Sequence, residues 1–198
     1  MAHSTPISSA NPLVILVTGL PASGKTTVAH QVARHLGLPV FGKDDFKEVL
    51  FDTLGWKDRQ WSRRLSQSCH RLLQCVLETE VAAGRSLIVE NNFPAHAAQQ
   101  LNRLRESVPY HSVQLQCVAR GEVLLDRFKR RSHSRDRHPG HVDSVLENEL
   151  RPSLLRGRPD PLNIPGPVLE VDTTDWETID WSRLLHRLDT VLNEFVHS

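Results

Sequence analysis

Eight consecutive residues near the start of the chain have the types and spacing of a phosphate-binding loop. In this pattern, G-x-x-x-x-G-K-[ST], glycines let the turn bend so that backbone N–H groups converge on phosphate oxygens at a helix N-terminus. The lysine lies against the β- and γ-phosphates and the last hydroxyl binds Mg²⁺. The pattern predicts a site for ATP and Mg²⁺; the alternative is a glycine-rich turn with a solvated lysine. The residues are Gly19, Leu20, Pro21, Ala22, Ser23, Gly24, Lys25 and Thr26, with Thr27 opening the following helix.

Two carboxylates follow the second predicted strand, which spans residues 39–41. In open α/β sheets the residues just past the carboxyl ends of the strands face the ligand crevice, so Asp44 and Asp45 are expected beside a phosphoryl acceptor. A carboxylate there can take the proton of an attacking hydroxyl. Asp45 has an alternative role as the N-cap of a helix beginning at Phe46, and Asp44 as a solvated turn residue.

Polar residues also follow the third predicted strand, residues 86–90. Glu90 stands where a carboxylate can hold metal-bound water, or it can be a charge facing solvent at the strand end. Asn91 and Asn92 are candidates for orienting the acceptor, although a turn before a proline also favours asparagine.

A basic segment begins inside a predicted helix and continues into an irregular stretch. On that helix Arg127 and Arg131 fall one turn apart on one face. A lid can deliver such arginines over the γ-phosphate while it excludes water, so we interpret residues 127–141 as a lid. A solvated helix face and a nucleic-acid backbone site are the alternatives. The segment also contains Arg130, Arg135, Arg137, His138 and His141.

The loop after the last predicted strand carries Thr173. By its position this residue can border the nucleotide base, or it can act as an N-cap for the segment that follows.

These groups need a scaffold that brings strand ends together, and the sequence supplies one. Apolar runs alternate with helical patterns, which is typical of a parallel sheet with helices on both faces. The predicted fold class is therefore α/β, a P-loop NTPase with five parallel strands and an arginine-rich lid. The expected strands span residues 13–18, 39–41, 86–90, 112–119 and 168–171, and the expected helices 27–36, 46–54, 59–83, 95–106, 122–131, 142–155 and 178–195.

Composition limits the other possibilities. The chain has 198 residues and a formal charge of +1, so net charge does not favour a protein that coats nucleic acid or anionic membrane. No apolar run reaches the roughly 18 residues of a membrane span. We expect a soluble, cytoplasmic protein with a disordered start over residues 1–12 and one domain over 13–198. Cys69, Cys75 and Cys117 lack metal-like spacing and fit reduced core thiols.

The motifs together resemble the small P-loop kinases and phosphotransferases of the predicted-kinase ATP-binding group. Zeta-toxin-type kinases, chloramphenicol phosphotransferase, gluconate kinase and the kinase domain of phage polynucleotide kinase belong to that group. The resemblance covers most of the chain and rests on four segments in the expected order. They are residues 19–27, Lys43-Asp44-Asp45-Phe46, Glu90-Asn91-Asn92-Phe93 and Arg137-His138-Pro139-Gly140-His141.

The resemblance implies roles for particular residues. Asp44 is implied to be the general base, Asp45 a secondary candidate, and Lys47 a basic residue near the acceptor or a phosphate. Arg127 and Arg131 correspond to lid arginines, with Arg137 a further candidate. The end of the third strand lacks the Asp-Thr-Asn pattern of polynucleotide kinases, which disfavours a nucleic-acid acceptor.

The sequence thus predicts an ATP-dependent phosphotransferase acting on a hydroxyl of a small molecule. Two rivals remain: a 5′-hydroxyl nucleic-acid kinase, and a regulatory ATPase without an acceptor. The aromatic residues Phe51, Trp56 and Trp61 can line the acceptor pocket or belong to the core. The acceptor and the oligomeric state are left open by the sequence.

Overall fold

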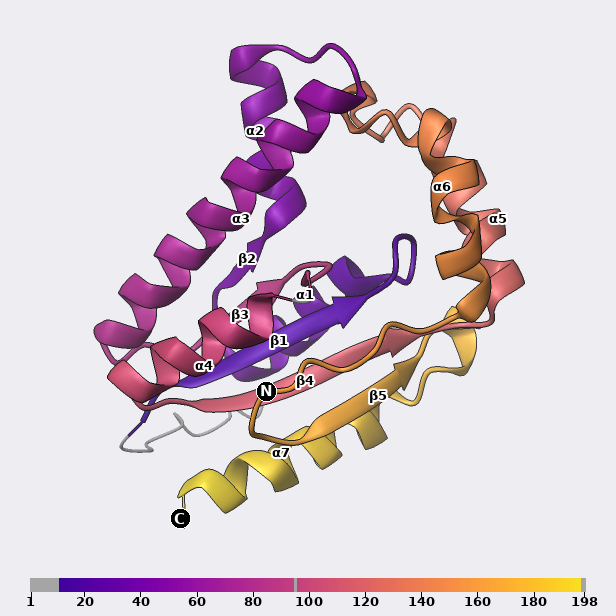
Figure 1. Ribbon diagram of the computed structural model, residues 1–198. Coiled ribbons are helices and arrows are strands. Elements are labelled where there is room, and N and C mark those ends of the chain that lie inside the picture. The colour runs from indigo at the N-terminus through magenta and orange to yellow at the C-terminus, as the bar shows by residue number, and fades with distance from the viewer. Residues whose placement is uncertain (1–10, 95, 197–198) are drawn as a thin grey trace.

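The computed structural model describes residues 11–94 and 96–196 of the chain. Strands and helices alternate along most of this length (Figure 1). The strands are β1 (Leu13–Gly19), β2 (Val40–Gly42), β3 (Leu87–Glu90), β4 (His111–Val118) and β5 (Val168–Asp172). The helices are α1 (Lys25–Leu36), α2 (Lys43–Leu54), α3 (Arg59–Ala82), α4 (Ala97–Ser107), α5 (Gly121–Ser132), α6 (Asp143–Arg156) and α7 (Trp181–Val196), with short 3₁₀ helices η1 (Pro139–His141) and η2 (Trp176–Thr178).

The five strands form one parallel sheet in the order β2-β3-β1-β4-β5, which confirms the predicted fold class. The central strand β1 pairs with β3 on one side, Val14 facing Leu87, and with β4 on the other, Leu13 facing His111. All seven residues of β1 are buried, as expected for an apolar run inside a sheet that is covered on both faces.

Each face of the sheet has its own layer of helices. Alternate β1 residues such as Ile15 and Val17 pack with α1 and α7, whereas Val14 and Leu16 pack with α3 and α4. Helices α5 and α6 pack against each other in a third apolar cluster that contains Leu124 and Phe128. In Figure 1 this pair stands on the opposite side of the phosphate loop from α2 and the start of α3.

Local signals account for several helix ends. Gly37 ends α1 in a left-handed conformation with φ of 67°, and its N–H donates to Ala33 O at 2.8 Å. Asp58 caps α3, because its carboxylate accepts from the N–H of Trp61 at 2.8 Å. The predicted start of α2 at Phe46 is wrong: the helix begins at Lys43, which places both aspartates in its first turn.

The structure bears on three other expectations, for the N-terminal residues, the cysteines and a membrane-spanning helix. Residues 1–10 of the expected disordered start lie outside the described residues, while Pro12 O accepts from the N–H of His111 at 2.9 Å. Cys69 and Cys117 are buried and reduced, but Cys75 is exposed on α3 and is no core thiol. Within the described ranges, no helix is both long enough and apolar enough to cross a bilayer.

Candidate active site

The phosphate loop and the first turn of α2 open onto one cavity at the carboxyl ends of β1, β2 and β3. Because these strands are parallel neighbours in the sheet, the loops that follow them emerge at the same edge. The cavity has a volume of about 340 Å³, and α3, α5 and α6 complete its wall. Its polar lining includes Lys25, Thr26, Lys43, Asp44, Asp45, Lys47, Glu48, Arg59, Ser66, Glu90, Asn91, Asn92, Arg131, Arg137, His141 and Asp143.

The phosphate loop is closely packed around Gly24. This residue has φ of 76°, and a Cβ on it would meet the Trp176 ring at 2.0 Å, so only glycine fits. The Lys25 side chain is buried, and its Nζ donates to Leu20 O at 3.1 Å. Burial lowers the pKa of Lys25, which the charge of Glu90 opposes. The Ser23 Oγ is buried with no hydrogen-bond partner among the described residues. The loop thus holds donors that fit phosphate oxygens.

Thr26 and Glu90 are direct neighbours. Thr26 Oγ1 donates to Glu90 Oε2 at 3.1 Å, so the two predicted magnesium-binding side chains lie together in the cavity wall. Both offer oxygen, which is the ligand type that Mg²⁺ prefers. Burial raises the pKa of Glu90, and a nearby cation would counter that effect. No cluster of three or more histidine, cysteine or acidic side chains suited to a metal occurs in the described part of the chain. The pair therefore fits a metal that is also held by nucleotide phosphates.

Asp44, in the first turn of α2, is held between two cations. Lys43 Nζ lies 3.1 Å from its Oδ1, and Arg137 Nη1 lies 3.1 Å from its Oδ2. Burial acts to raise the pKa of Asp44, but the charges of Lys43 and Arg137 outweigh it and hold that pKa well below its usual range. The carboxylate is therefore ionised across the physiological pH range.

Asp45 has a different environment from its neighbour. A Cβ built on Gly42 would lie 2.5 Å from Asp45 Oδ2, so this carboxylate folds back over the residue that caps α2. The alternative role of Asp45 as an N-cap is wrong, because the cap is Gly42 and Asp45 stands in the first turn. Burial and the charge of Asp44 raise the pKa of Asp45.

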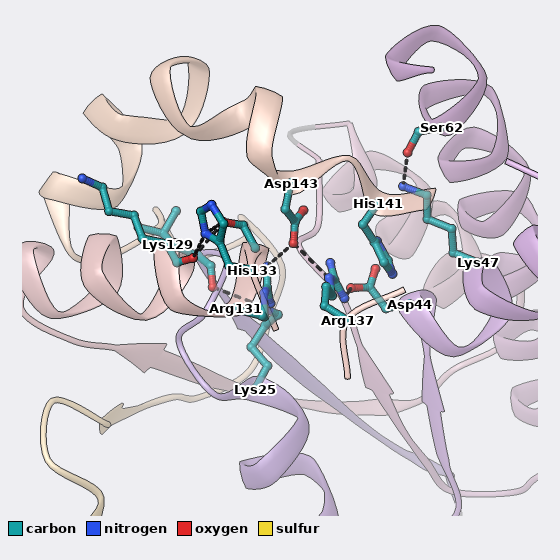
Figure 2. A network of polar contacts seen from close by, with 12 residues as sticks. Lys25, Asp44, Lys47, Ser62, Lys129, Arg131, His133, Arg137, His141 and Asp143 are labelled. Atoms are coloured by element: carbon teal, nitrogen blue, oxygen red, sulfur yellow. Dashed lines mark hydrogen bonds and ion pairs between the residues drawn. The ribbon is translucent and has the colours of Figure 1, made fainter. Parts of the chain in front are cut away.

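Two arginines of the predicted lid segment meet an aspartate of α6 in the cavity wall. Asp143 Oδ2, at the start of α6, lies 2.9 Å from Arg137 Nε and 3.3 Å from Arg131 Nη2. Figure 2 shows Asp143 between the two arginines, with Asp44 beyond Arg137. The preceding residue, Val142, has φ of 50°, which costs a β-branched side chain roughly 1–3 kcal/mol. This strained turn positions Asp143.

An aromatic contact fixes the lid segment to α2. The Phe51 ring stacks on His138 with centroids 4.9 Å apart and meets His141 edge-on at 5.2 Å. Gly140 approaches so closely that an added Cβ would meet the Phe51 ring at 2.7 Å. His141 Nε2 donates to Glu48 Oε1 at 2.9 Å, and burial lowers the pKa of His141 to about 3. Phe51 therefore packs against the lid segment and does not line the cavity.

Two predicted site residues face elsewhere. Arg127 donates to Thr173 O at 2.8 Å and Thr174 O at 3.0 Å, and its guanidinium lies 5.2 Å from the Trp176 ring centroid. It is absent from the lining of the cavity, which includes Arg131, and its place over the γ-phosphate stays a prediction. The Thr173 side chain is 0 % exposed, and its hydroxyl lies 2.9 Å from Ser23 O and 3.0 Å from Val118 O. It anchors the phosphate loop to β4.

That arrangement also corrects the alternative role of Thr173. The following 3₁₀ helix η2 is capped by Asp175, whose carboxylate accepts from Glu177 N at 3.1 Å, so Thr173 is not an N-cap.

Of the remaining candidate site residues, the two asparagines line the cavity and the two tryptophans do not. Asn91 and Asn92 both line the cavity. The buried Asn91 amide lies 3.0 Å from His70 Nδ1, and its Oδ1 has no partner among the described residues. Trp56 and Trp61 do not line the cavity.

Several lining residues were missed by the sequence reasoning. Glu48, Arg59 and Asp143 are ordinary helix residues in the sequence, and no local pattern distinguishes them from solvated charges. Spacing provides one signal in hindsight: Glu48 follows Asp44 by four residues, which places the two on the same face of a helix.

Comparison with protein-family models identifies the family of the chain. The family described as AAA domain matches residues 14–151, from β1 into α6. The chain belongs to the AAA domain family. The AAA-domain match includes the phosphate loop, Asp44, Glu90 and the lid segment. Among curated proteins, none matches this AAA-domain chain significantly.

Solved structures with the same fold include kinases. A candidate kinase from Chloroflexus aurantiacus is 41 % identical to this AAA-domain chain, with a TM-score of 0.84, and the match covers 91 % of this chain and 98 % of that one. Kti12 from Chaetomium thermophilum, solved with ADP-AlF3, is 17 % identical with a TM-score of 0.63, covering 91 % and 99 %. The APS kinase of Mycobacterium tuberculosis, solved with AMPPNP and APS, is 18 % identical with a TM-score of 0.51, covering 92 % and 98 %. The similarity of the last two proteins to this chain is one of fold.

Proposed function

We propose that the protein is an ATP-dependent kinase that transfers the γ-phosphate to a hydroxyl group of a small molecule. The observation that carries this proposal is that Lys25 and Asp44 open onto the same cavity, with Arg131 and Arg137 beside them. A site for donor phosphates therefore faces a carboxylate that can accept a proton. The description of the Chloroflexus relative as a candidate kinase agrees with the proposal.

The donor end of the site holds the nucleotide. Backbone N–H groups of the phosphate loop and Lys25 Nζ bind the phosphates, and Thr26 with Glu90 would hold Mg²⁺. Magnesium, when bound, supplies charge neutralisation at the β- and γ-phosphate oxygens. We place the nucleotide base toward Arg127 and Trp176, whose 5.2 Å contact borders the loop.

The acceptor end supplies the base. The hydroxyl oxygen forms a bond to the γ-phosphorus, the bond from that phosphorus to the bridging oxygen of ADP breaks, and Asp44 takes the hydroxyl proton. Arg131 approaches the γ-phosphate and stabilises the charge on its outer oxygens. Its present partner, Asp143, holds it in reach of the cavity.

The acceptor is a small molecule in this proposal, because the cavity is bounded by the lid segment. Arg131 and Arg137 pair with carboxylates inside that cavity, so they do not form an exposed strip for a nucleic-acid backbone. This observation favours a metabolite over an oligonucleotide end.

A screen of acceptors tests the proposal. Formation of ADP from ATP is measured with sugars, nucleosides, sugar nucleotides, antibiotics and a 5′-hydroxyl oligonucleotide, in the wild type and in Lys25→Ala. We expect ADP formation that requires an acceptor and Lys25. Hydrolysis at one rate with every compound would instead indicate a regulatory ATPase, and transfer only to the oligonucleotide would indicate a nucleic-acid kinase.

A further inference from the structure

Lys47 is a buried ammonium in the wall of the cavity. It lies on α2 one turn after Asp44, and its side chain is 5 % exposed. Its Nζ donates to Ser62 Oγ on α3 at 2.9 Å (Figure 2). The same Nζ lies 5.2 Å from the Phe51 ring centroid. Neither contact brings a negative charge to the ammonium.

The lysines and arginines that line the cavity divide into two groups. Lys43 and Arg137 pair with Asp44, Arg131 pairs with Asp143, and Arg59 pairs with Glu149. Within the described residues, Lys25 and Lys47 are the lining cations with no carboxylate oxygen within 4.0 Å. The chain therefore neutralises four of its lining cations and leaves two ammonium groups to other partners.

A buried charge without a counterion is costly, and proteins relieve the cost by deprotonation or by binding an opposite charge. Burial and the charge of Lys43 lower the pKa of Lys47 to about 8, so most of the group is still protonated at neutral pH. Lys25 illustrates the second form of relief, since the lysine of a phosphate loop is matched by nucleotide phosphates. Lys47, at the acceptor end of the cavity, is likewise a buried ammonium without a carboxylate partner.

We propose that the acceptor is an alcohol carrying an anionic group, a phosphate, sulfate or carboxylate, which binds Lys47 Nζ. This inference rests on the proposed kinase function and specifies its substrate class. Asp44 and Lys47 are three residues apart on one helix, which places their Cβ atoms roughly 5–6 Å apart on the same face. The anionic group therefore lies within a few bonds of the reacting hydroxyl, and an uncharged polyol leaves the ammonium unmatched.

Titration with inorganic phosphate tests the site directly. One titration uses protein saturated with AMPPNP, so that the phosphate loop is occupied. A second uses Lys25→Ala without nucleotide, so that the result does not depend on nucleotide binding. In both, Lys47→Met should weaken phosphate binding at least tenfold and Lys47→Arg should restore part of it, measured by calorimetry. Lys57→Met, an exposed change on the loop before α3, is the control and should leave binding unchanged.

Thermal unfolding separates an anion site from a structural tether. If Lys47 binds an anion, phosphate raises the melting temperature of the wild type but not of Lys47→Met, and Ser62→Ala keeps the phosphate response. Equal phosphate binding in wild type and Lys47→Met, or no binding to either wild type or Lys25→Ala, overturns the proposal. Failure of AMPPNP to bind the wild type would instead overturn the proposed kinase function.

Discussion

Arg137 Nη1 lies 3.1 Å from Asp44 Oδ2, so an arginine of the lid segment is paired with the carboxylate that we propose as the general base. Lys43 lies 3.1 Å from the other oxygen of that carboxylate. Both oxygens therefore have cationic partners, and an acceptor hydroxyl has to share or replace one of them. The same pairing makes Asp44 a weaker base and keeps it ionised at low pH.

Removal of the Arg137 charge should shift the pH dependence of the reaction. In Arg137→Gln the pKa of Asp44 rises, because one of the charges that lower it is gone. The acidic limb of the kcat/KM profile, where the base becomes protonated, should then move to higher pH. The profile is measured with the acceptor identified in the screen. Arg130→Gln, which removes an exposed arginine that pairs with Asp126, should leave the limb in place.

Replacement of each of the two neighbouring aspartates by asparagine should identify the general base. Asp44→Asn should lower kcat by about 10²–10⁴-fold, the usual contribution of a general base. The affinity for AMPPNP should change little, because Asp44 lies at the acceptor end of the cavity. Asp45→Asn should have a smaller effect on kcat, since that carboxylate folds back over Gly42. The reverse order of effects would assign the base to Asp45.

Thr173→Val should loosen the phosphate loop. The change removes a buried hydroxyl that lies within hydrogen-bond distance of Ser23 O and Val118 O. The free energy of unfolding should fall by about 1–3 kcal/mol, because buried backbone oxygens lose a donor. AMPPNP should also bind more weakly. Urea unfolding and calorimetry measure the two effects, and Thr190→Val, an exposed change on α7, should alter neither.

Two glycines with similar backbone angles provide a matched pair of variants. Gly37 has φ of 67° with no atom within 4 Å of an added Cβ, whereas at Gly24, with φ of 76°, that Cβ meets Trp176. Gly37→Ala should cost about 1–2 kcal/mol of stability from the left-handed backbone alone. Gly24→Ala should cost more and should also abolish AMPPNP binding. Equal losses of stability in the two variants would argue against the Trp176 contact.

Two histidines, the buried His141 and the partly buried His70, should make the fold sensitive to acid. His141 has a pKa of about 3 and His70 a pKa of about 4 in the folded protein, both lowered by burial from 6.5. Below pH 6.5 the unfolded chain takes up protons that the folded chain does not, so stability falls as the pH decreases toward these values. His141→Gln should lose less stability than the wild type between pH 6.5 and 4.5 in urea titrations. Parallel curves for the two proteins would contradict this assignment.

The sequence predicted the scaffold more fully than the contacts inside the site. The apolar run of β1 and the phosphate-loop pattern are local signals, so the strand, the turn and the helix after them were found. Helix spacing puts Arg127 and Arg131 on one face, but it does not show that Arg127 contacts the Thr173 carbonyl and Trp176, because those partners lie far along the chain. Partners far apart along the chain, such as Phe51 and His138, leave no local pattern.

The place of β1 in the sheet also determines when the site can form during synthesis. Leu13 pairs with His111, and Val14 pairs with Leu87, so both neighbours of the strand are made long after it. A ribosome completes the phosphate loop before it reaches β3 and β4, so the pairings that hold β1 must wait until those strands have emerged. A nascent chain that ends before β4 carries the nucleotide motif in its sequence without the sheet that shapes it.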